Sequence, residues 1–299
     1  MRLFSFQGLH YAWEAADLPA GELAAPPYDQ IDDQMRDELH AVSPHQFTHL
    51  TRPVAEDDVD EYRHAAELHD EWLAEGVVAR DATPSIYPYA IEFPDGALRL
   101  GIAALIGLEP PDSAAIRPHE RTLAKPLADR LKLLETMRVD LEPALFVSDD
   151  AGELDQLLHR DVAELPALVT HLDENGYRHV LYRLEDPRRI ALYRDALARA
   201  DGAIADGHHR YKVAQEFAKH HSPAAGTAAA AKLAVVTSLD SPALTIDPIH
   251  RALADTPDLS PLHALIAQRT RPELPAEAVG TAFAAAVAAA PQPAVGVLL

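Results

Sequence analysis

The fold is decided by the stretch Ala203-Ile204-Ala205-Asp206-Gly207-His208-His209-Arg210-Tyr211, in which a short apolar run leads into a glycine turn. Tyr211, Ala214 and Ala218 follow at helical spacing, which predicts a strand, a turn at Gly207 and a helix. Glycine has no Cβ, so a ligand can approach the backbone closely there. Free N–H groups and the positive end of the helix dipole then lie beside two imidazoles and a guanidinium. The sequence therefore predicts an anion site, and phosphate is the usual anion.

The simpler alternative for this turn is a capped helix start with solvated side chains. Two adjacent histidines on a helix point apart and cannot both face the core, so we favour phosphate binding. Asp206 keeps two interpretations, because aspartate is a preferred helix N-cap and also a ligand for a divalent cation.

Further motifs occur in order along the chain. They are Ala25-Pro26-Pro27-Tyr28-Asp29, Ser43-Pro44, Pro118-His119-Glu120-Arg121-Thr122-Leu123, then Lys125, Asp129 and Arg130, and finally Asp247-Pro248-Ile249-His250-Arg251. With the turn at Gly207, this ordered set resembles domain-of-unknown-function family 1015, and the set is specific although each motif alone is weak.

The turn from Asp206 to Arg210 also resembles the phosphate-binding turn of the ParB and sulfiredoxin superfamily. This resemblance implies a mixed α/β (α+β) fold, with a ParB/sulfiredoxin-like core over residues 111–299 and an additional N-terminal α/β portion over residues 1–110. The two portions are also compatible with one continuous domain. The superfamily includes kinases of free serine, and some closer family members resemble pyrophosphate-dependent serine kinases.

Glu120 is the general base that the resemblance implies. A carboxylate within hydrogen-bond reach of a hydroxyl group assists its phosphorylation. Without the resemblance, a surface salt bridge to a neighbouring arginine is the better explanation for this residue.

Phosphoryl transfer requires mainly positioning and charge neutralisation. The groups expected to bind the donor phosphates are His119, Lys125, Arg130, Asp206, Gly207, His208, His209, Arg210 and Arg251. Arg251 has the alternative of simply ending a strand. Magnesium is the expected cofactor, with Asp129 and Asp206 as its candidate ligands.

Tyr28 and Asp29 follow two prolines, so turn formation alone explains the composition of this segment. As part of a family motif they are expected to line the substrate pocket. The histidines, with Glu120, are also adequate ligands for zinc or iron, which leaves a metal-dependent hydrolase as a lesser alternative.

The composition bounds the remaining possibilities. The 299 residues are 48% hydrophobic and carry a formal net charge of −21, which disfavours nucleic-acid binding and favours a small phosphorylated ligand. The chain has no cysteine, which excludes disulfides and sulfiredoxin chemistry. No apolar run is long enough for a membrane span, so we expect a cytoplasmic protein with no membrane partner.

The pattern also predicts individual elements. Residues 86–93 and 99–106 read as a hairpin around Pro94-Asp95-Gly96, and residues 59–75 as a helix that ends at Gly76. Residues 47–50 read as a short strand, and 294–299 as an interior strand. The chain ends earlier than the members of the resembled family do, which leaves open any function of a further segment.

The sequence thus predicts an enzyme that transfers a phosphoryl group from pyrophosphate or a nucleotide to a free hydroxyl, with L-serine as the first candidate acceptor. The partners are the small-molecule substrate and its phosphoryl donor. The alternative is a phosphate- or nucleotide-sensing module that keeps the turn at Gly207 and does not need Glu120. The phosphoryl donor and the oligomeric state stay open.

Overall fold

The computed structural model describes residues 1–12, 20–110, 113–120 and 124–245. Contacts divide the chain into two units, Met1–Leu244 and Thr245–Leu299, and the description below concerns the first. The predicted strand at 294–299 lies outside the described residues.

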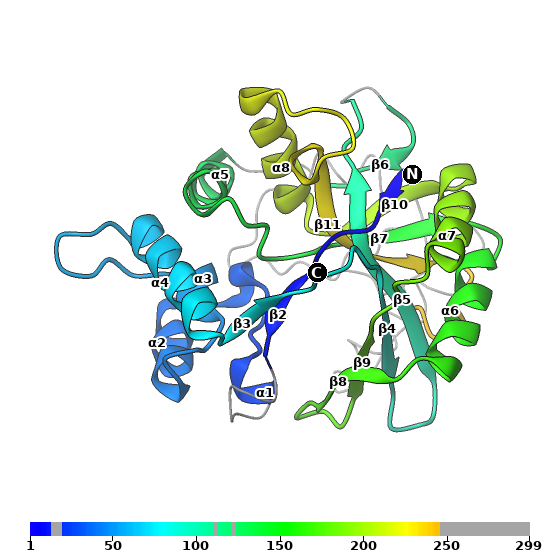
Figure 1. The fold of residues 1–299 in the computed structure, drawn as a ribbon, viewed down its shortest axis with the longest axis horizontal. Coiled ribbons are helices and arrows are strands. Elements are labelled where there is room, and N and C mark those ends of the chain that lie inside the picture. The colour runs from blue at the N-terminus through cyan, green and yellow to red at the C-terminus, as the bar shows by residue number, and fades with distance from the viewer. Residues whose placement is uncertain (13–19, 111–112, 121–123, 246–299) are drawn as a thin grey trace, which may run out of the picture. The chain divides into compact units, whose positions relative to one another are not determined.

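A mixed sheet of nine strands forms the centre of the first unit (Figure 1). Its strand order is β6-β10-β7-β11-β5-β4-β9-β8, and β1 pairs with β5. The strands are β1 (Leu3–Phe4), β4 (Tyr87–Glu92), β5 (Leu98–Gly107), β6 (Ile116–Arg117), β7 (Ala144–Asp149), β8 (Ala167–Leu172), β9 (Arg178–Tyr182), β10 (Asp201–Asp206) and β11 (Ala231–Ser238). Parallel pairs, such as β7 with β11, lie beside antiparallel ones, such as β5 with β11. The fold is therefore mixed α/β, as predicted.

A two-stranded sheet of β2 (Leu9–Tyr11) and β3 (Val78–Arg80) lies apart from this sheet. The helices are α1 (Ala20–Leu23), α2 (Asp33–Val42), α3 (Thr48–Thr51), α4 (Glu61–Glu75), α5 (Ala124–Met137), α6 (Glu153–Glu164), α7 (Pro187–Arg199) and α8 (His208–His221), with 3-10 turns η1 (Tyr28–Gln30) and η2 (Ala228–Ala230). Figure 1 shows α6 beside α7, and α5 beside α8.

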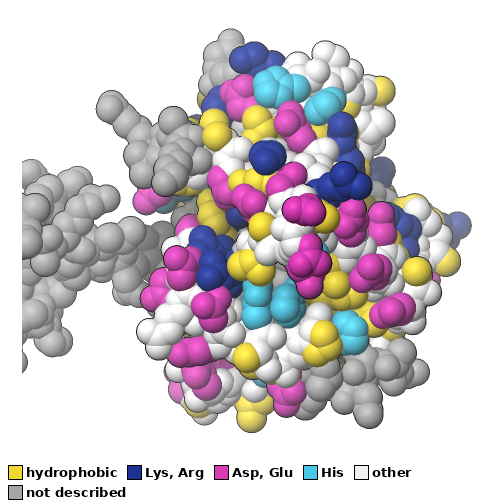
Figure 2. Space-filling view, turned by 90° about the vertical axis from the view of Figure 1, so that its left-hand side faces the viewer, with side chains coloured by type: hydrophobic (Ala, Val, Ile, Leu, Met, Phe, Trp, Pro, Cys, Tyr) yellow, Lys and Arg dark blue, Asp and Glu magenta, His cyan; other side chains and the backbone are white. Residues whose placement is uncertain are grey.

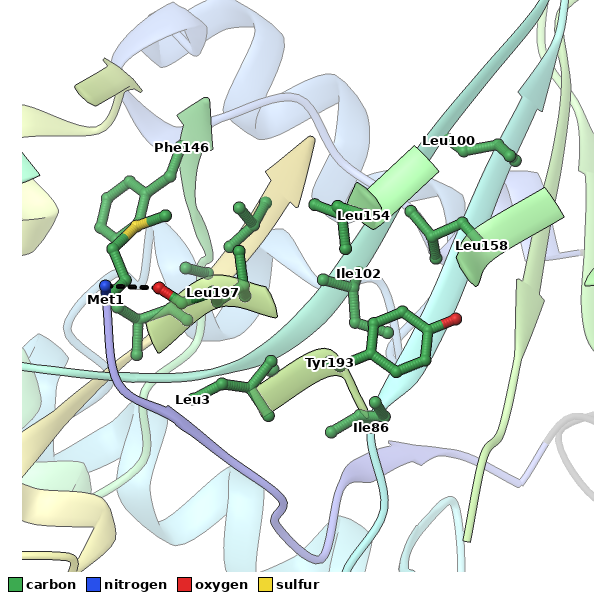
Figure 3. Close-up of a cluster of buried hydrophobic side chains, with 14 of the residues drawn as sticks. Met1, Leu3, Ile86, Leu100, Ile102, Phe146, Leu154, Leu158, Tyr193 and Leu197 are labelled. Atoms are coloured by element: carbon green, nitrogen blue, oxygen red, sulfur yellow. Dashed lines mark hydrogen bonds between the residues drawn. The ribbon is translucent and has the colours of Figure 1, made fainter. Parts of the chain in front are cut away.

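The main core lies on one face of the sheet. Phe146 and Ile102 are fully buried against Leu154 of α6 and Tyr193 of α7 (Figure 3). The N-terminal amino group of Met1 reaches this core, where it donates hydrogen bonds to the carbonyls of Leu197 (2.7 Å) and Ala200 (3.1 Å) at the end of α7. The last carbonyls of a helix have few intrahelical donors, so the amino group helps to cap α7, together with the Ala200 N–H, which also bonds the Leu197 carbonyl (3.3 Å).

A second cluster of buried side chains joins the N-terminal helices to α5. It contains Tyr11, Leu23, Leu50, Tyr62, Ala65, Trp72, Leu133 and Met137. The two clusters do not divide the chain at residue 110, because β1, β4 and β5 belong to the same sheet as β7, β10 and β11. The boundary at 110 stays a prediction.

Two local predictions had different outcomes. The helix over 59–75 is confirmed as α4, and Gly76 ends it in the left-handed conformation with φ of 75°. The predicted strand at 47–50 is wrong, since Thr48–Thr51 forms α3. The Gln46 side chain accepts a hydrogen bond from the Thr48 N–H (2.6 Å) and so satisfies the first turn of this short helix.

Candidate functional site

The turn at Gly207 forms as predicted. β10 ends at Asp206, Gly207 occupies the N-cap position with φ of 87°, and α8 begins at His208. No side chain caps this helix end, so its first N–H groups point outward without a side-chain acceptor. Asp206 is not the N-cap, because its carboxylate instead pairs with Arg210 one turn along. The arrangement is suited to an anion.

The side chains of this turn divide among three pockets, which we name after one lining residue each. His209 lines the Tyr28 pocket, His208 lines the Glu120 pocket, and Asp206 and Arg210 line the Tyr89 pocket. The adjacent histidines point apart, as predicted for successive helix positions.

The Tyr28 pocket brings together five residues that were predicted from the sequence as site residues. Tyr28 and Asp29 of η1, Asp129 and Arg130 of α5, and His209 of α8 all line it, around a volume of about 770 Å³. These residues lie up to 181 positions apart in the sequence (209 − 28), so only the fold assembles them.

Arg130 organises the wall of the Tyr28 pocket. Its guanidinium lies over the Tyr28 ring at 4.5 Å, pairs with Asp129 (2.7 Å) and donates to the Thr51 carbonyl. The other oxygen of Asp129 accepts from the Tyr62 hydroxyl (2.8 Å). Burial raises the pKa of Tyr28, so its hydroxyl stays protonated near neutral pH.

Sequence reasoning missed three further residues of this pocket, Arg36, Arg52 and Tyr62. Arg36 and Arg52 both pair with Asp33, at 3.0 and 3.1 Å. Neither arginine belongs to a motif, so no signal in the sequence singled them out. Together with Arg130 they give the pocket the guanidinium groups that bind phosphate oxygens well.

The Glu120 pocket has a volume of about 480 Å³ and contains a histidine of defined tautomer. Nε2 of the buried His208 accepts a hydrogen bond from the His119 N–H (3.1 Å), and the two rings stack at 4.4 Å. In the neutral ring the proton therefore resides on Nδ1, which lies 3.8 Å from a carboxylate oxygen of Glu120. Burial, and next the neighbouring His119, lower the pKa of His208. His208 is thus a neutral donor facing an exposed carboxylate.

Arg210 is held by the protein itself. Its guanidinium bonds the Asp206 carboxylate and the Pro143 carbonyl, and the residue is only 9% exposed. These bonds tie the first turn of α8 to the segment before β7 and use two of the five N–H donors of Arg210.

Two of the residues predicted to bind the donor phosphates lie wholly or partly outside the described part of the chain. The side chain of Lys125 and the whole of Arg251 lie outside the described residues. The two nominated metal ligands, Asp129 and Asp206, line different pockets, and each is paired with an arginine. They do not fit a single magnesium site. Over the part of the chain that the structure covers, no three His, Asp or Glu side chains gather as metal ligands.

The surface and helices add two observations. On the face drawn in Figure 2, Lys and Arg side chains are interspersed with Asp and Glu and form no broad basic patch. Among residues 1–12, 20–110, 113–120 and 124–245, no helix has both the length and the apolar character needed to cross a bilayer.

Fold and site together define a mixed α/β protein with a helix N-terminus at a glycine turn that has no side-chain cap, and the residues of this turn line three pockets. The chain belongs to the family described as protein of unknown function (DUF1015), whose model matches residues 3–287. No curated protein and no solved structure matches the chain.

Proposed function

We propose that this protein is a small-molecule kinase, which transfers a phosphoryl group from pyrophosphate or a nucleotide to a free hydroxyl, with L-serine as the first candidate acceptor. The observation that carries the proposal is the Tyr28 pocket, where His209 from the uncapped turn of α8 meets Arg130, Arg36 and Arg52. Such a set of donors at a helix N-terminus suits the charge that phosphoryl transfer must neutralise.

In the proposed step, the acceptor hydroxyl oxygen attacks the terminal phosphorus of the donor. A new O–P bond forms while the bond from phosphorus to the bridging oxygen breaks, and phosphate or the shortened nucleotide leaves with that electron pair. The hydroxyl proton passes to a carboxylate, for which Glu120 is the first candidate. Glu120 lines the same pocket as His208 and not the Tyr28 pocket, which contains Asp29 as the competing carboxylate. His208 Nδ1 lies 3.8 Å from the Glu120 carboxylate.

A ParB/sulfiredoxin-like core, a cytoplasmic location and a magnesium complex of the donor remain parts of this proposal. Magnesium would neutralise the donor phosphates. Because Asp129 and Asp206 do not share a site, no step is assigned to the metal.

The test is phosphorus NMR of the purified protein with magnesium and L-serine, with pyrophosphate, ADP and ATP in separate tubes. A phosphoserine resonance in one tube would establish the activity and identify the donor. Donor line broadening without transfer would instead favour the phosphate- or nucleotide-sensing module, and no change at all would refute both.

Variants then separate catalysis from binding. Glu120→Gln should lower turnover by about 10²-fold or more while donor binding persists. Asp29→Asn tests the exposed carboxylate of the Tyr28 pocket as a competing base. Glu153→Gln is the matched control, because Glu153 lines none of the three pockets and only pairs with Arg199.

A further inference from the structure

The Tyr89 pocket lies on the less covered face of the sheet. Along β7 and β11, Phe146 and Val236 are buried on the core face, whereas Leu145 and Val235 are only half-buried on the other. Alternate residues of a strand point to opposite faces, so Tyr89, Arg99 and Val235 share this second face. They line a pocket of about 270 Å³, a size suited to a small metabolite.

Two arginines line this pocket, Arg99 and Arg210, and Arg210 is already bound to Asp206 and to the Pro143 carbonyl. Arg99 is half-buried and lies over the Phe93 ring at 5.3 Å. Within the described residues, no carboxylate forms an ion pair with Arg99. By contrast, Arg178 on β9 of the same sheet bonds Glu92 at 2.6 Å. A guanidinium in a partly apolar pocket binds a carboxylate strongly, often through two hydrogen bonds.

Tyr89 adds a directed hydrogen-bond acceptor. Its hydroxyl lies 2.5 Å from His179 Nδ1, and His179 Nε2 lies 3.4 Å from an Asp173 oxygen. The carboxylate only accepts, so in the neutral ring Nε2 carries the proton and Nδ1 accepts from the tyrosine. Burial raises the pKa of Tyr89 to about 12, so the hydroxyl keeps its proton. Because the hydroxyl donates its hydrogen bond to His179 Nδ1, the lone pairs of its oxygen remain available to accept from a donor in the pocket.

The spacing of the two groups matches a compact ligand. Tyr89 pairs with Gly101 across the β4–β5 ladder, and Arg99 stands two residues from Gly101 on the same face. Diagonal neighbours of this kind have backbones about 7–8 Å apart, and their long side chains reach a common ligand. A Cβ at Gly101 would lie 2.9 Å from Val235 Cγ1, so the strands pack closely at this point and Val235 forms the floor between the two side chains.

We propose that the Tyr89 pocket binds a small carboxylic acid that carries a hydroxyl or ammonium group, with Arg99 holding the carboxylate and the Tyr89 oxygen accepting from the second group. Asp206 on the rim places this ligand next to the turn at Gly207. The inference goes beyond the proposed kinase activity, because binding of the acid does not require phosphoryl transfer.

The first experiment is saturation-transfer NMR with matched probes, L-lactate against L-lactamide and L-serine against L-serinamide, each added alone. We expect at least one acid to bind and its amide to bind more weakly. Arg99→Gln should weaken binding of that acid about tenfold or more, and Tyr89→Phe should weaken it by a smaller factor. Arg178→Gln, the paired arginine in the same sheet, is the control and should leave binding unchanged.

A second measurement uses the protein without substitutions and so does not depend on how the variants fold. Phenylglyoxal modifies arginines, and peptide mass spectrometry follows each site. The acid that binds should slow modification of Arg99 and leave the rate at Arg178 unchanged. The proposal is overturned if neither acid binds, if Arg99→Gln binds as tightly as the original, or if Arg99 gains no protection.

Discussion

At the scale of single residues, Gly207 is the position on which the site depends. Its φ of 87° is unfavourable for other residues. A Cβ there would also lie 3.0 Å from Arg210 Nε and 3.1 Å from the Ala144 Cα. One contact is with backbone and the other with a guanidinium that the protein holds in place, so neither can move easily.

Gly207→Ala should therefore lower the free energy of unfolding by about 2–3 kcal/mol, from backbone strain plus the close contacts. Gly226→Ala is the matched control, since its φ is 83° and no atom lies within 4 Å of the added Cβ. Gly226→Ala should lower the free energy of unfolding by only about 1 kcal/mol, because backbone strain is the only unfavourable effect there. Urea unfolding measures both, and equal losses would show that the contacts at Gly207 do not matter.

His208 predicts a pH dependence. Its pKa is lowered in the folded state, chiefly by burial, so the unfolded chain takes up this proton first as the pH falls. The contribution of His208 is present above its ordinary pKa of about 6.5 and is lost as the pH falls below it.

His208→Gln should therefore make the fall in unfolding free energy between pH 7.5 and 5.5 shallower, as urea titrations at several pH values would show. His159→Gln, at a half-exposed histidine of α6, is the control. An unchanged slope in His208→Gln would mean that His208 titrates alike in both states.

At the scale of elements, the segment before β7 connects three parts of the site. Glu142 accepts from the Tyr28 N–H (2.9 Å), and the Pro143 carbonyl accepts from Arg210. The buried Lys232 of β11 pairs with Asp140 and donates to the Glu142 carbonyl (2.6 Å). The segment 140–143 thus fixes the positions of η1, α8 and β11 relative to one another.

Lys232→Met should destabilise the protein by about 2–3 kcal/mol, because Asp140 and the Glu142 carbonyl lose their partner while still partly buried. Lys219→Met on α8, which removes an exposed pair with Glu216, should change stability by less than about 0.5 kcal/mol. Thermal and urea unfolding compare them. If Lys232→Met were as stable as the original, the buried ion pair would be dispensable.

At the scale of the whole first unit, one sheet joins the N-terminal and later parts of the chain. β5 pairs with β11 from Ala231 to Val236, and β7 lies beyond it. The fully buried side chains of Ile102, Ala104 and Ile106 on β5 therefore pack in a core that later residues complete.

A fragment of residues 1–110 should consequently fail to fold by itself, since β5 would keep β1 and β4 but lose β11, and its apolar face would meet water. Far-UV circular dichroism during a urea titration is the measurement, and the full chain is the reference. A cooperative transition in the fragment would show that the boundary predicted at 110 is a true domain boundary.

The sequence by itself determined the elements whose signals are local. The turn at Gly207, the hairpin of β4 and β5 and the C-terminus of α4 at Gly76 all follow from glycine positions and short periodic runs. The family was also evident from the motifs. The strand predicted at 47–50 failed because the Gln46 side chain and the Leu23 carbonyl, which binds the Phe47 N–H, favour a helical turn there.

Only the tertiary structure decided how the nominated residues are grouped. It gathered Tyr28, Asp129, Arg130 and His209 in one pocket and placed His208 with Glu120 in another. It also revealed Arg99 and Tyr89, which no motif contains. The physical reason is that a strand or turn depends on neighbours in sequence, whereas a pocket depends on which distant side chains the sheet and its packed helices bring to the same face.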